Sequence, residues 1–352
     1  MAVLCGPSKR NAWAMTDRKD FLRSLSILKE IVLSDTPERR EVIERAYGAN
    51  SWFVPAFTEQ ALLAIAEEFL DEQKCAQWIA SYGSPDKEQK TVALIMAGNL
   101  PLVGFHDLLS VLASGHAAMI KLSDKDPYLL PWITEQWIKI CPSLSSAITY
   151  TAKFEGFDAV IATGSNNSAR YFDYYFRSYP HILRQNRNGV ALLTGNETLD
   201  DLKKLANDIF LFFGLGCRNV SKIFVPHGYD FSLWDEAMSE WKFMEDNNKY
   251  KNNLEYNYAI FLINSIPHIN LGQLILKEDK AIASRIGCLH YSYYDAMLTV
   301  EEMLELRRQE IQCVVSGSPV NGWEHIRFGE SQHPRLDQYA DGVDTMQFLA
   351  SL

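Results

Sequence analysis

The sequence predicts an α/β fold in which parallel strands are covered by helices on both faces. Short, uninterrupted apolar runs such as TVALIMAG (91–98) and GVALLTG (189–195) are typical of strands buried on both sides of a parallel sheet. Segments with helical periodicity separate these runs, and strands that alternate with helices favour a parallel sheet. A chain of 352 residues is also long enough for two packed domains.

The first ninety residues are predicted to be helical. The segment 17–33 carries apolar residues at helical spacing. Thr36 and Pro37 form an N-cap followed by proline at the first helical position, and this helix is expected to stop near Gly48. Thr58 is expected to cap a long helix that runs to about Ala80.

From residue 90 onward, predicted strands alternate with helices. After the strand at 91–98, further strands are predicted at HAAMIKL (116–122), FDAVIATGS (157–165), GVALLTG (189–195) and NVSKIFV (219–225). Helices are predicted between them, within 99–115 and 123–140, from 165 to about 179, and over 199–213. The segment 228–253 is polar and is expected to be exposed.

Composition excludes several classes of protein. The formal net charge of −10 and the lack of a basic tract argue against a nucleic-acid partner. The first residues lack the apolar core of a signal peptide, and no apolar run approaches membrane-spanning length. Six scattered cysteines without CxxC or zinc-like spacing predict reduced thiols, a cytoplasmic protein and no metal site. They are Cys5, Cys75, Cys141, Cys217, Cys288 and Cys313.

Polar residues follow three of the predicted strands. Asn99 follows the first, Lys121 and Ser123 end the second, and Gly164 with Ser165 ends the third. Because ligands of open parallel sheets bind at the carboxyl edge, these residues are expected to face one crevice. The helix that starts after Ser165 suits a pyrophosphate. The chain has no G-x-G-x-x-G fingerprint.

Cys217 is the candidate nucleophile. It lies in FFGLGCRNVSKIFVP (212–226), at the predicted corner between helix and strand. The positive charges of Arg218 and Lys222 would favour the thiolate, although alternation along the strand could turn one of them away. The negative end of the preceding helix acts in the opposite sense. A backbone N–H of the corner, together with Asn99, could form an oxyanion hole. The alternative is a small buried hydrophobic residue.

Taken together, these stretches resemble the aldehyde dehydrogenase superfamily. The chain is most similar to its acyl-CoA reductase branch, which includes the fatty-acid reductase of bacterial bioluminescence. The resemblance runs from about residue 50 to the C-terminus, with NSWFVPAFTEQAL and YADGVDTMQFL as branch-like stretches. It is strongest over 92–124, 157–165 and 189–225. The fold it implies has a Rossmann-like cofactor domain and a smaller α/β catalytic domain.

The resemblance implies roles for six residues. Cys217 matches the nucleophile of the family, and Asn99 matches the amide that helps to hold the oxyanion. The remaining four match cofactor contacts on the ribose and adenosine side and at the pyrophosphate turn: Lys121, Ser123, Gly164 and Ser165. The implied boundaries are 1–185 for the N-terminal helices and cofactor domain and 186–335 for the catalytic domain. Residues 336–352 would return to the cofactor domain or form an oligomer contact.

Two departures from the family pattern shape the expected reaction. The glutamate that opens Glu-Leu-Gly-Gly in oxidising members is missing near Arg184, where the chain reads RQNRNG. Ser284, in SRIG, stands where those members carry the glutamate that grips the nicotinamide ribose. Without a general base, chemistry that excludes water is favoured. The expected function is therefore reduction of an acyl-CoA, of the fatty acyl class, to an aldehyde, with NADPH or alternatively NADH.

The sequence is also compatible with other interpretations. One is an acyltransferase or thioesterase-like use of Cys217 without hydride transfer. Another is a non-catalytic partner of an acyl-activating protein, and a homo-oligomer is also compatible with the sequence. The run YFDYYFRSYPHI (171–182) could line an acyl tunnel or form a buried helix face. Arg184 and Arg187 could meet an anionic substrate such as coenzyme A or lie in a solvated turn.

Overall fold

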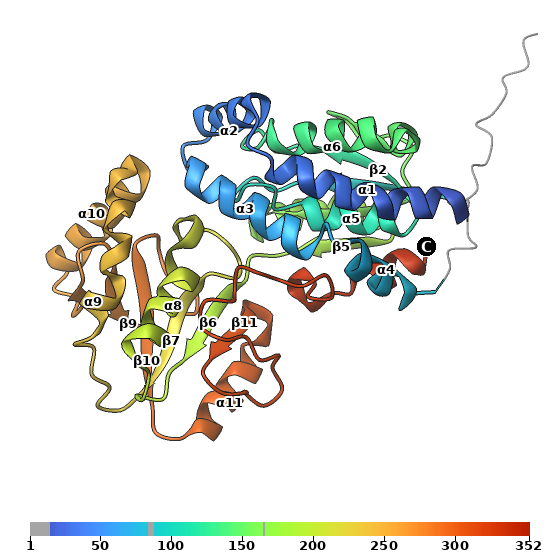
Figure 1. The fold of residues 1–352 in the computed structure, drawn as a ribbon. Coiled ribbons are helices and arrows are strands. Elements are labelled where there is room, and N and C mark those ends of the chain that lie inside the picture. The colour runs from blue at the N-terminus through green and yellow to red at the C-terminus, as the bar shows by residue number, and fades with distance from the viewer. Residues whose placement is uncertain (1–14, 84–87, 165) are drawn as a thin grey trace, which may run out of the picture. The chain divides into compact units, whose positions relative to one another are not determined.

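The chain folds into two compact units. The computed structural model describes residues 15–352 except 84–87 and 165 (Figure 1). One unit comprises Met1–Asn50, Thr58–Gln185 and Arg335–Leu352, and the other comprises Ser51–Phe57 and Asn186–Pro334. Each unit is built around its own sheet. The predicted α/β class is confirmed.

The first unit contains a five-stranded parallel sheet in the order β3-β2-β1-β4-β5. Its strands are β1 (Thr91–Ile95), β2 (Ala117–Lys121), β3 (Ile148–Tyr150), β4 (Ala159–Thr163) and β5 (His181–Arg184). The chain runs outward from β1 to β3 and then returns to β4 on the other side of β1. This reversal between β1 and β4 is the topological switch point at which Rossmann-type folds bind their ligands.

Helices flank this first sheet (Figure 1). Their bounds are α1 (Met15–Leu33), α2 (Pro37–Ala49), α3 (Pro55–Glu68), α4 (Glu72–Ala80), α5 (Phe105–Ala113), α6 (Leu129–Ile140), α7 (Asn166–Phe176) and α12 (Thr345–Ala350). The predicted cap of α2 is confirmed, because the Thr36 hydroxyl accepts a hydrogen bond from the Arg39 N–H. Among the described residues, no helix is both long and apolar enough to cross a membrane.

Two expectations for the first unit are wrong. The helix expected from Thr58 to Ala80 is two helices, since the Asp71 side chain caps the N-terminus of α4 by accepting from the Lys74 N–H. Thr58 is buried inside α3 instead of capping it. Strands β3 and β5 were not predicted. They are only three and four residues long, so they carry too little periodic signal.

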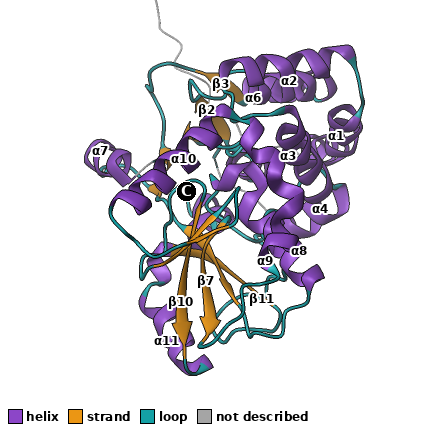
Figure 2. Cartoon of the chain, turned by 90° about the vertical axis from the view of Figure 1, so that its left-hand side faces the viewer, coloured by secondary structure: helices purple, strands orange, loops and turns teal. Residues whose placement is uncertain are grey.

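The second unit contains a six-stranded sheet in the order β11-β6-β7-β10-β9-β8. Its strands are β6 (Asn188–Leu192), β7 (Val220–Pro226), β8 (Ile269–Asn270), β9 (Ile275–Glu278), β10 (Cys288–Tyr294) and β11 (Ile311–Ser316). All neighbours are parallel except β8 and β9. Figure 2 shows β7 and β10 as neighbouring arrows that point the same way. The helices are α8 (Leu199–Phe210), α9 (Trp234–Met238), α10 (Asn248–Ile263) and α11 (Met297–Leu306).

The segment 228–253, expected to be exposed, contributes to the core of the second unit. Trp234, Met238, Met244 and Tyr250 are buried. The indole N–H of Trp234 donates to the Tyr229 hydroxyl at 3.1 Å. Polar residues separate these four buried side chains along the chain. The average polarity of the segment therefore predicted its burial wrongly.

Candidate active site

Four of the predicted site residues lie at one edge of the first sheet. Asn99 lies in the loop after β1, Lys121 is the last residue of β2, Ser123 follows it, and Gly164 comes directly after β4. Strands β2, β1 and β4 are adjacent, parallel and in register at their carboxyl ends. The three strand ends therefore present these residues at the same edge. Ser165 lies outside the described residues.

The loops after β1 and β2 are packed closely against each other. A Cβ at Gly98 would lie 2.4 Å from the Ser123 Oγ, so only glycine fits there without displacing the serine. The Ser123 Oγ accepts from the Lys125 N–H at 3.3 Å. The buried Asn50 amide donates to the Lys125 carbonyl at 3.2 Å and to the Gly98 carbonyl at 3.5 Å. Ser123 thus helps to shape the edge.

A buried carboxylate holds the same loop from the other side. Asp126 accepts from the Leu102 N–H at 3.0 Å and from the Leu129 N–H at 3.3 Å, so it joins the β1–α5 loop to the start of α6. Burial raises the pKa of Asp126 to about 6, although both hydrogen bonds oppose that shift. Leu102 has a left-handed backbone with φ of 58°. Sequence reasoning missed Asp126, because its motif reads as an ordinary polar turn.

This edge suits an anionic dinucleotide. It lies at the switch point between β1 and β4, and α7 begins immediately after the end of β4, so its first N–H groups are at the same edge. The side chains of Asn99, Lys121 and Lys125 are exposed there. Their amide and ammonium groups are donors for phosphate and ribose oxygens. The residues present therefore fit a nicotinamide cofactor.

Cys217 lies in the second unit, in an irregular corner between α8 and β7. The 3₁₀ segment η2 (Leu211–Gly214) follows α8 and contains two consecutive left-handed residues, Phe212 with φ 55° and Phe213 with φ 58°. Each such non-glycine residue costs roughly 1–2 kcal/mol. Both rings are buried and pack on Phe57, with ring centroids 5.8 and 4.9 Å away. Strain of this kind often marks functional segments.

The amide of Asn219 holds the Cys217 corner in place. Its Oδ1 accepts from the Gly216 N–H at 2.8 Å, directly before the half-buried Cys217. Its Nδ2 donates to the Asp208 carbonyl at 3.0 Å and to the Leu211 carbonyl at 2.9 Å at the end of α8. These bonds satisfy carbonyls that the end of a helix leaves without partners. Sequence reasoning used Asn219 only as the start of a strand and missed this role.

A second buried carboxylate anchors the end of α8. Asp208 is fully buried, and it accepts from the Gly329 N–H at 2.6 Å and from the Ser331 N–H at 2.9 Å. Burial raises the pKa of Asp208 to about 6. The Gly189 N–H donates to the Asn219 carbonyl at 2.9 Å, and a Cβ at Gly189 would lie 2.5 Å from the Arg218 carbonyl oxygen. Strand β6 therefore approaches the backbone that follows the thiol.

Of the two cations considered for Cys217, Lys222 is directed elsewhere. Its side chain is fully buried and donates to the Asp279 carbonyl and the Ser292 hydroxyl on neighbouring segments. Burial lowers the pKa of Lys222 to about 8. Arg218 directly follows the thiol, and its Nη1 is buried with no hydrogen-bond partner within the described part of the chain.

Arg184 has a structural role that neither sequence interpretation foresaw. It is buried and forms a bidentate ion pair with Asp107, with an Nη2 to Oδ1 distance of 2.5 Å. It also donates to the Ala340 carbonyl at 2.7 Å and to the Thr345 hydroxyl at 2.9 Å. Its guanidinium ties β5 to α5 and to the C-terminal segment. Arg184 therefore does not lie in a solvated turn, and its guanidinium is occupied by Asp107, Ala340 and Thr345 and not by an anionic substrate.

The aromatic run 171–182 is divided between core and surface. Phe172 and Phe176 pack on the cluster of β1 and β4 side chains in the first sheet. Tyr171, Tyr174 and Tyr175 are 60–67% exposed. The buried-face interpretation is therefore right for only one side of α7. In the second unit, the Ser284 hydroxyl donates to the Cys288 carbonyl at 2.6 Å.

The fold is that of aldehyde dehydrogenases. No family profile and no curated protein sequence matches the chain. Aldehyde dehydrogenase 21 from Physcomitrella patens, in complex with succinate, is 10% identical and has a TM-score of 0.66 over 97% of this chain and 84% of that chain. An oxidoreductase from Marinobacter aquaeolei is 12% identical, with a TM-score of 0.65 over 97% of this chain and 86% of its own.

A NAD+ complex of aldehyde dehydrogenase from Bacillus cereus gives a similar result. It is 12% identical, with a TM-score of 0.60 over 86% of this chain and 72% of that chain. Sequence identities this low show a shared fold and no more. The Physcomitrella patens and Bacillus cereus proteins are aldehyde dehydrogenases, so the expected fold is confirmed.

Proposed function

We propose that this protein is an NAD(P)H-dependent oxidoreductase that reduces an acyl-CoA thioester, of the fatty acyl class, to an aldehyde. The observation that carries the proposal is the Cys217 corner: a half-buried thiol follows a strained segment and is held by the buried Asn219 amide. A backbone built this rigidly around a thiol is typical of a positioned nucleophile. The aldehyde dehydrogenase fold supports the same reaction class by analogy.

In the proposed first step, the Cys217 thiolate attacks the thioester carbonyl carbon. A carbon–sulfur bond to Cys217 forms, the bond to coenzyme A breaks, and coenzyme A leaves as its thiolate. Arg218, the next residue, is the proposed source of the positive charge that favours the attacking thiolate. Asn99 is the proposed side-chain donor to the oxyanion, and the Cys217 N–H is the proposed backbone donor. The product is an acyl group on Cys217.

Lys121, Ser123 and Gly164 are the proposed cofactor-holding residues, with NADPH preferred and NADH as the alternative. When bound, the reduced nicotinamide supplies a hydride to the acyl carbon. The carbonyl carbon then carries hydrogen, the bond to Cys217 breaks, and aldehyde leaves. Asn99 would stabilise the oxygen charge that develops in this step as well.

The acyl group on Cys217 is expected to resist water. Near Arg184 the sequence offers arginine, glutamine and asparagine, none of which can take a proton from water at neutral pH. The Arg184 guanidinium is already bound to Asp107. The acyl-enzyme should therefore return to coenzyme A or be reduced. We propose on this basis that the physiological reaction is reductive.

A second candidate is acyl transfer by Cys217 without hydride transfer. The specific observation in its favour is Ser284, which stands where the resemblance calls for a glutamate and whose hydroxyl is used by the Cys288 carbonyl. A hydroxyl engaged in this way offers less to a ribose than a carboxylate would. The two candidates differ in one product, since only the reductase releases an aldehyde.

A two-stage experiment tests the proposal. The protein is mixed with labelled acyl-CoA without cofactor, and mass spectrometry locates the acyl adduct, which is expected on the Cys217 peptide. Excess acyl-CoA is then removed, and decay of the adduct is followed with and without NADPH. Aldehyde release that depends on NADPH supports the reductase. An adduct on another cysteine, or rapid decay to free acid without NADPH, would contradict it.

A further inference from the structure

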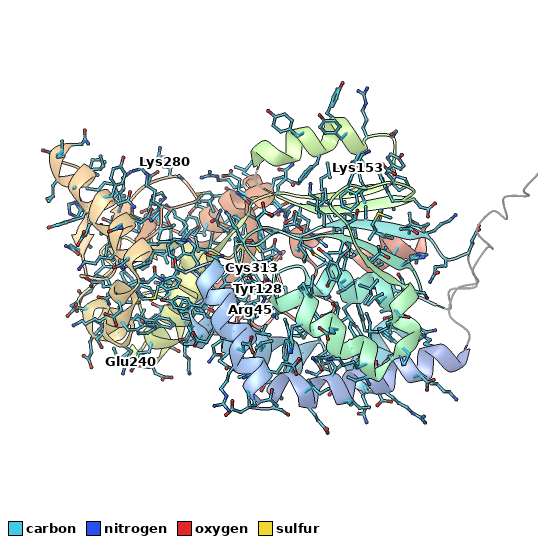
Figure 3. The ribbon with its side chains drawn as sticks, turned by 90° about the horizontal axis from the view of Figure 1, so that it is seen from above. Arg45, Tyr128, Lys153, Glu240, Lys280 and Cys313 are labelled. Carbon is cyan, nitrogen blue, oxygen red and sulfur yellow. The ribbon has the colours of Figure 1, made fainter. Side chains whose placement is uncertain are left out.

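Helix α2 runs antiparallel along α6 in the first unit and ends at the carboxyl edge of the sheet. Near the start of α2, Glu38 accepts from the Gln136 amide at 2.8 Å, in the second half of α6. Seven residues later, the Arg45 guanidinium lies over the ring of Tyr128, 4.4 Å from its centroid, directly before α6 begins (Figure 3). Because α6 follows β2, this stacked pair lies where β2 ends.

The segment that follows α2 is tied to the same edge. The Asn50 amide, buried at the end of α2, donates to the backbone carbonyls of Lys125 and Gly98 in the loops after β2 and β1. The end of α2 is therefore fixed relative to the two loops that border the switch point. Arg45 reaches this edge on a rigid element and does not depend on a mobile loop for its position.

Exposed charges of both signs lie in this region. The exposed bases are Arg45, Lys121 and Lys125, and the exposed acids are Asp124, Glu41 and Glu44. Asp126 is buried and accepts from two backbone N–H groups. A guanidinium that lies over an aromatic ring can still use its N–H groups for paired hydrogen bonds to a phosphate.

We propose that Arg45, held over Tyr128 and assisted by Lys125, binds the 2′-phosphate of NADPH and makes this phosphorylated cofactor the preferred one. In Rossmann-type folds the end of the second strand meets the adenosine ribose, where an acid suits a 2′-hydroxyl and an arginine suits a 2′-phosphate. The inference rests on the proposed function, because it assumes that the dinucleotide occupies this edge. It adds a residue from outside the βαβ unit as the determinant of specificity.

Coenzyme A carries the same chemical group, a ribose phosphate monoester, at its 3′ position. The position at the end of β2 favours the 2′-phosphate of the cofactor. Two fragments separate these sources, adenosine 2′,5′-bisphosphate for NADPH and adenosine 3′,5′-bisphosphate for coenzyme A. AMP lacks the additional phosphate and reports on the adenosine contacts alone.

The test is calorimetric binding of these three fragments, NADPH and NADH to the full chain. Wild type should bind the 2′,5′-bisphosphate more tightly than AMP or the 3′,5′-bisphosphate. Arg45→Gln should weaken binding of the 2′,5′-bisphosphate and of NADPH by about ten- to a hundredfold, as expected for a charge-assisted hydrogen bond, and leave AMP and NADH within about twofold. Arg45→Lys keeps the positive charge but cannot form paired hydrogen bonds, so its affinities for the 2′,5′-bisphosphate and NADPH should lie between those of wild type and Arg45→Gln.

The matched control is Arg40→Gln, which removes the same charge from the other end of α2, where Arg40 pairs with Asp35. It should leave all five affinities unchanged. Equal affinity for the 2′,5′-bisphosphate and AMP, or no effect of Arg45→Gln, would overturn the inference while dinucleotide binding still supported the proposed function. Selective loss of the 3′,5′-bisphosphate would assign Arg45 to coenzyme A instead. Failure of wild type to bind either dinucleotide would overturn the proposed function itself.

Discussion

The carboxyl edge of the first sheet and the Cys217 corner of the second unit are both held by a buried aspartate, but the backbone around that aspartate is regular at the edge and irregular at the corner. In each, a buried aspartate accepts two backbone N–H groups and holds a neighbouring segment, Asp126 at the edge and Asp208 at the corner. At the edge, regular strands deliver exposed side chains. At the corner, two left-handed phenylalanines and a buried amide are needed to place one thiol. Parallel strands provide a site through topology, whereas the corner must be built from side-chain contacts.

The largest expected effect is loss of the corner's thiol. Cys217→Ser should abolish the acyl adduct and lower kcat by at least about 10⁴-fold, in the range known for removal of a nucleophile. Dinucleotide binding at the edge should persist, as measured by NADPH fluorescence. The matched control is Cys141→Ser, since Cys141 is a buried thiol whose Sγ already lies 3.3 Å from the Ser143 hydroxyl. Adduct formation that survives in Cys217→Ser would contradict the assignment.

The second-largest expected effect is that of substituting Asn99, which lies at the edge. Asn99→Ala should lower kcat by about 10²- to 10³-fold with little change in KM, because an oxyanion donor acts only as charge develops. The free energy of unfolding should change by no more than about 0.5 kcal/mol, since the side chain is exposed. A change confined to KM would assign Asn99 to binding. Steady-state kinetics and urea unfolding provide the two readouts.

Asn219→Ala, at the corner, should mainly lower the stability of the fold, in contrast to Asn99→Ala, which should mainly lower kcat. The substitution leaves the Gly216 N–H and the helix-end carbonyls of Asp208 and Leu211 without their partner. We expect a loss of about 3 kcal/mol in the free energy of unfolding, because each buried group left without a partner costs roughly 1–3 kcal/mol. Alkylation of Cys217 by iodoacetamide should also change in rate. Unchanged stability would show that water or backbone relaxation replaces the amide.

The smallest effect concerns the two buried aspartates, Asp126 at the edge and Asp208 at the corner, and it depends on pH. The pKa values of Asp126 and Asp208 are about 6 in the folded chain, above the ordinary value of 3.8. The folded state therefore holds protons that the unfolded state has released between pH 4 and 6, and the stability contributed by these protons is lost as pH rises through that window. Below pH 4 the contribution is fully present.

Asp126→Asn and Asp208→Asn should each remove the contribution of one aspartate to the loss of stability between pH 4 and 6. Wild type should be more stable relative to either variant at pH 4 than at pH 7, as measured by urea unfolding at both values. Similar pH-dependent changes for the two variants would show that the two buried aspartates contribute equally to stability. A difference that does not vary with pH in one variant would mean that its aspartate is not protonated in the folded state.

The α/β class followed from the sequence because strand and helix periodicities are local. Buried strands such as β1 and β6 appear as unbroken apolar runs, and the Thr36–Pro37 cap marks the start of α2. The strand ends that carry Asn99, Lys121 and Gly164 also follow from these runs, since a parallel sheet brings them to one edge. The short strands β3 and β5 are too brief to be recognised in this way.

The roles of charged and polar side chains were decided only by tertiary structure. Arg184 looked like a surface cation but pairs with Asp107, which lies 77 positions away in the chain. Lys222 is turned to Asp279 and Ser292, and the Asn219 amide reaches back to the end of α8. The sequence determined where strands, helices and their polar ends lie, because those depend on neighbouring residues. Which partner a buried charge or amide finds depends on segments distant in the chain, and burial makes each such choice energetically decisive.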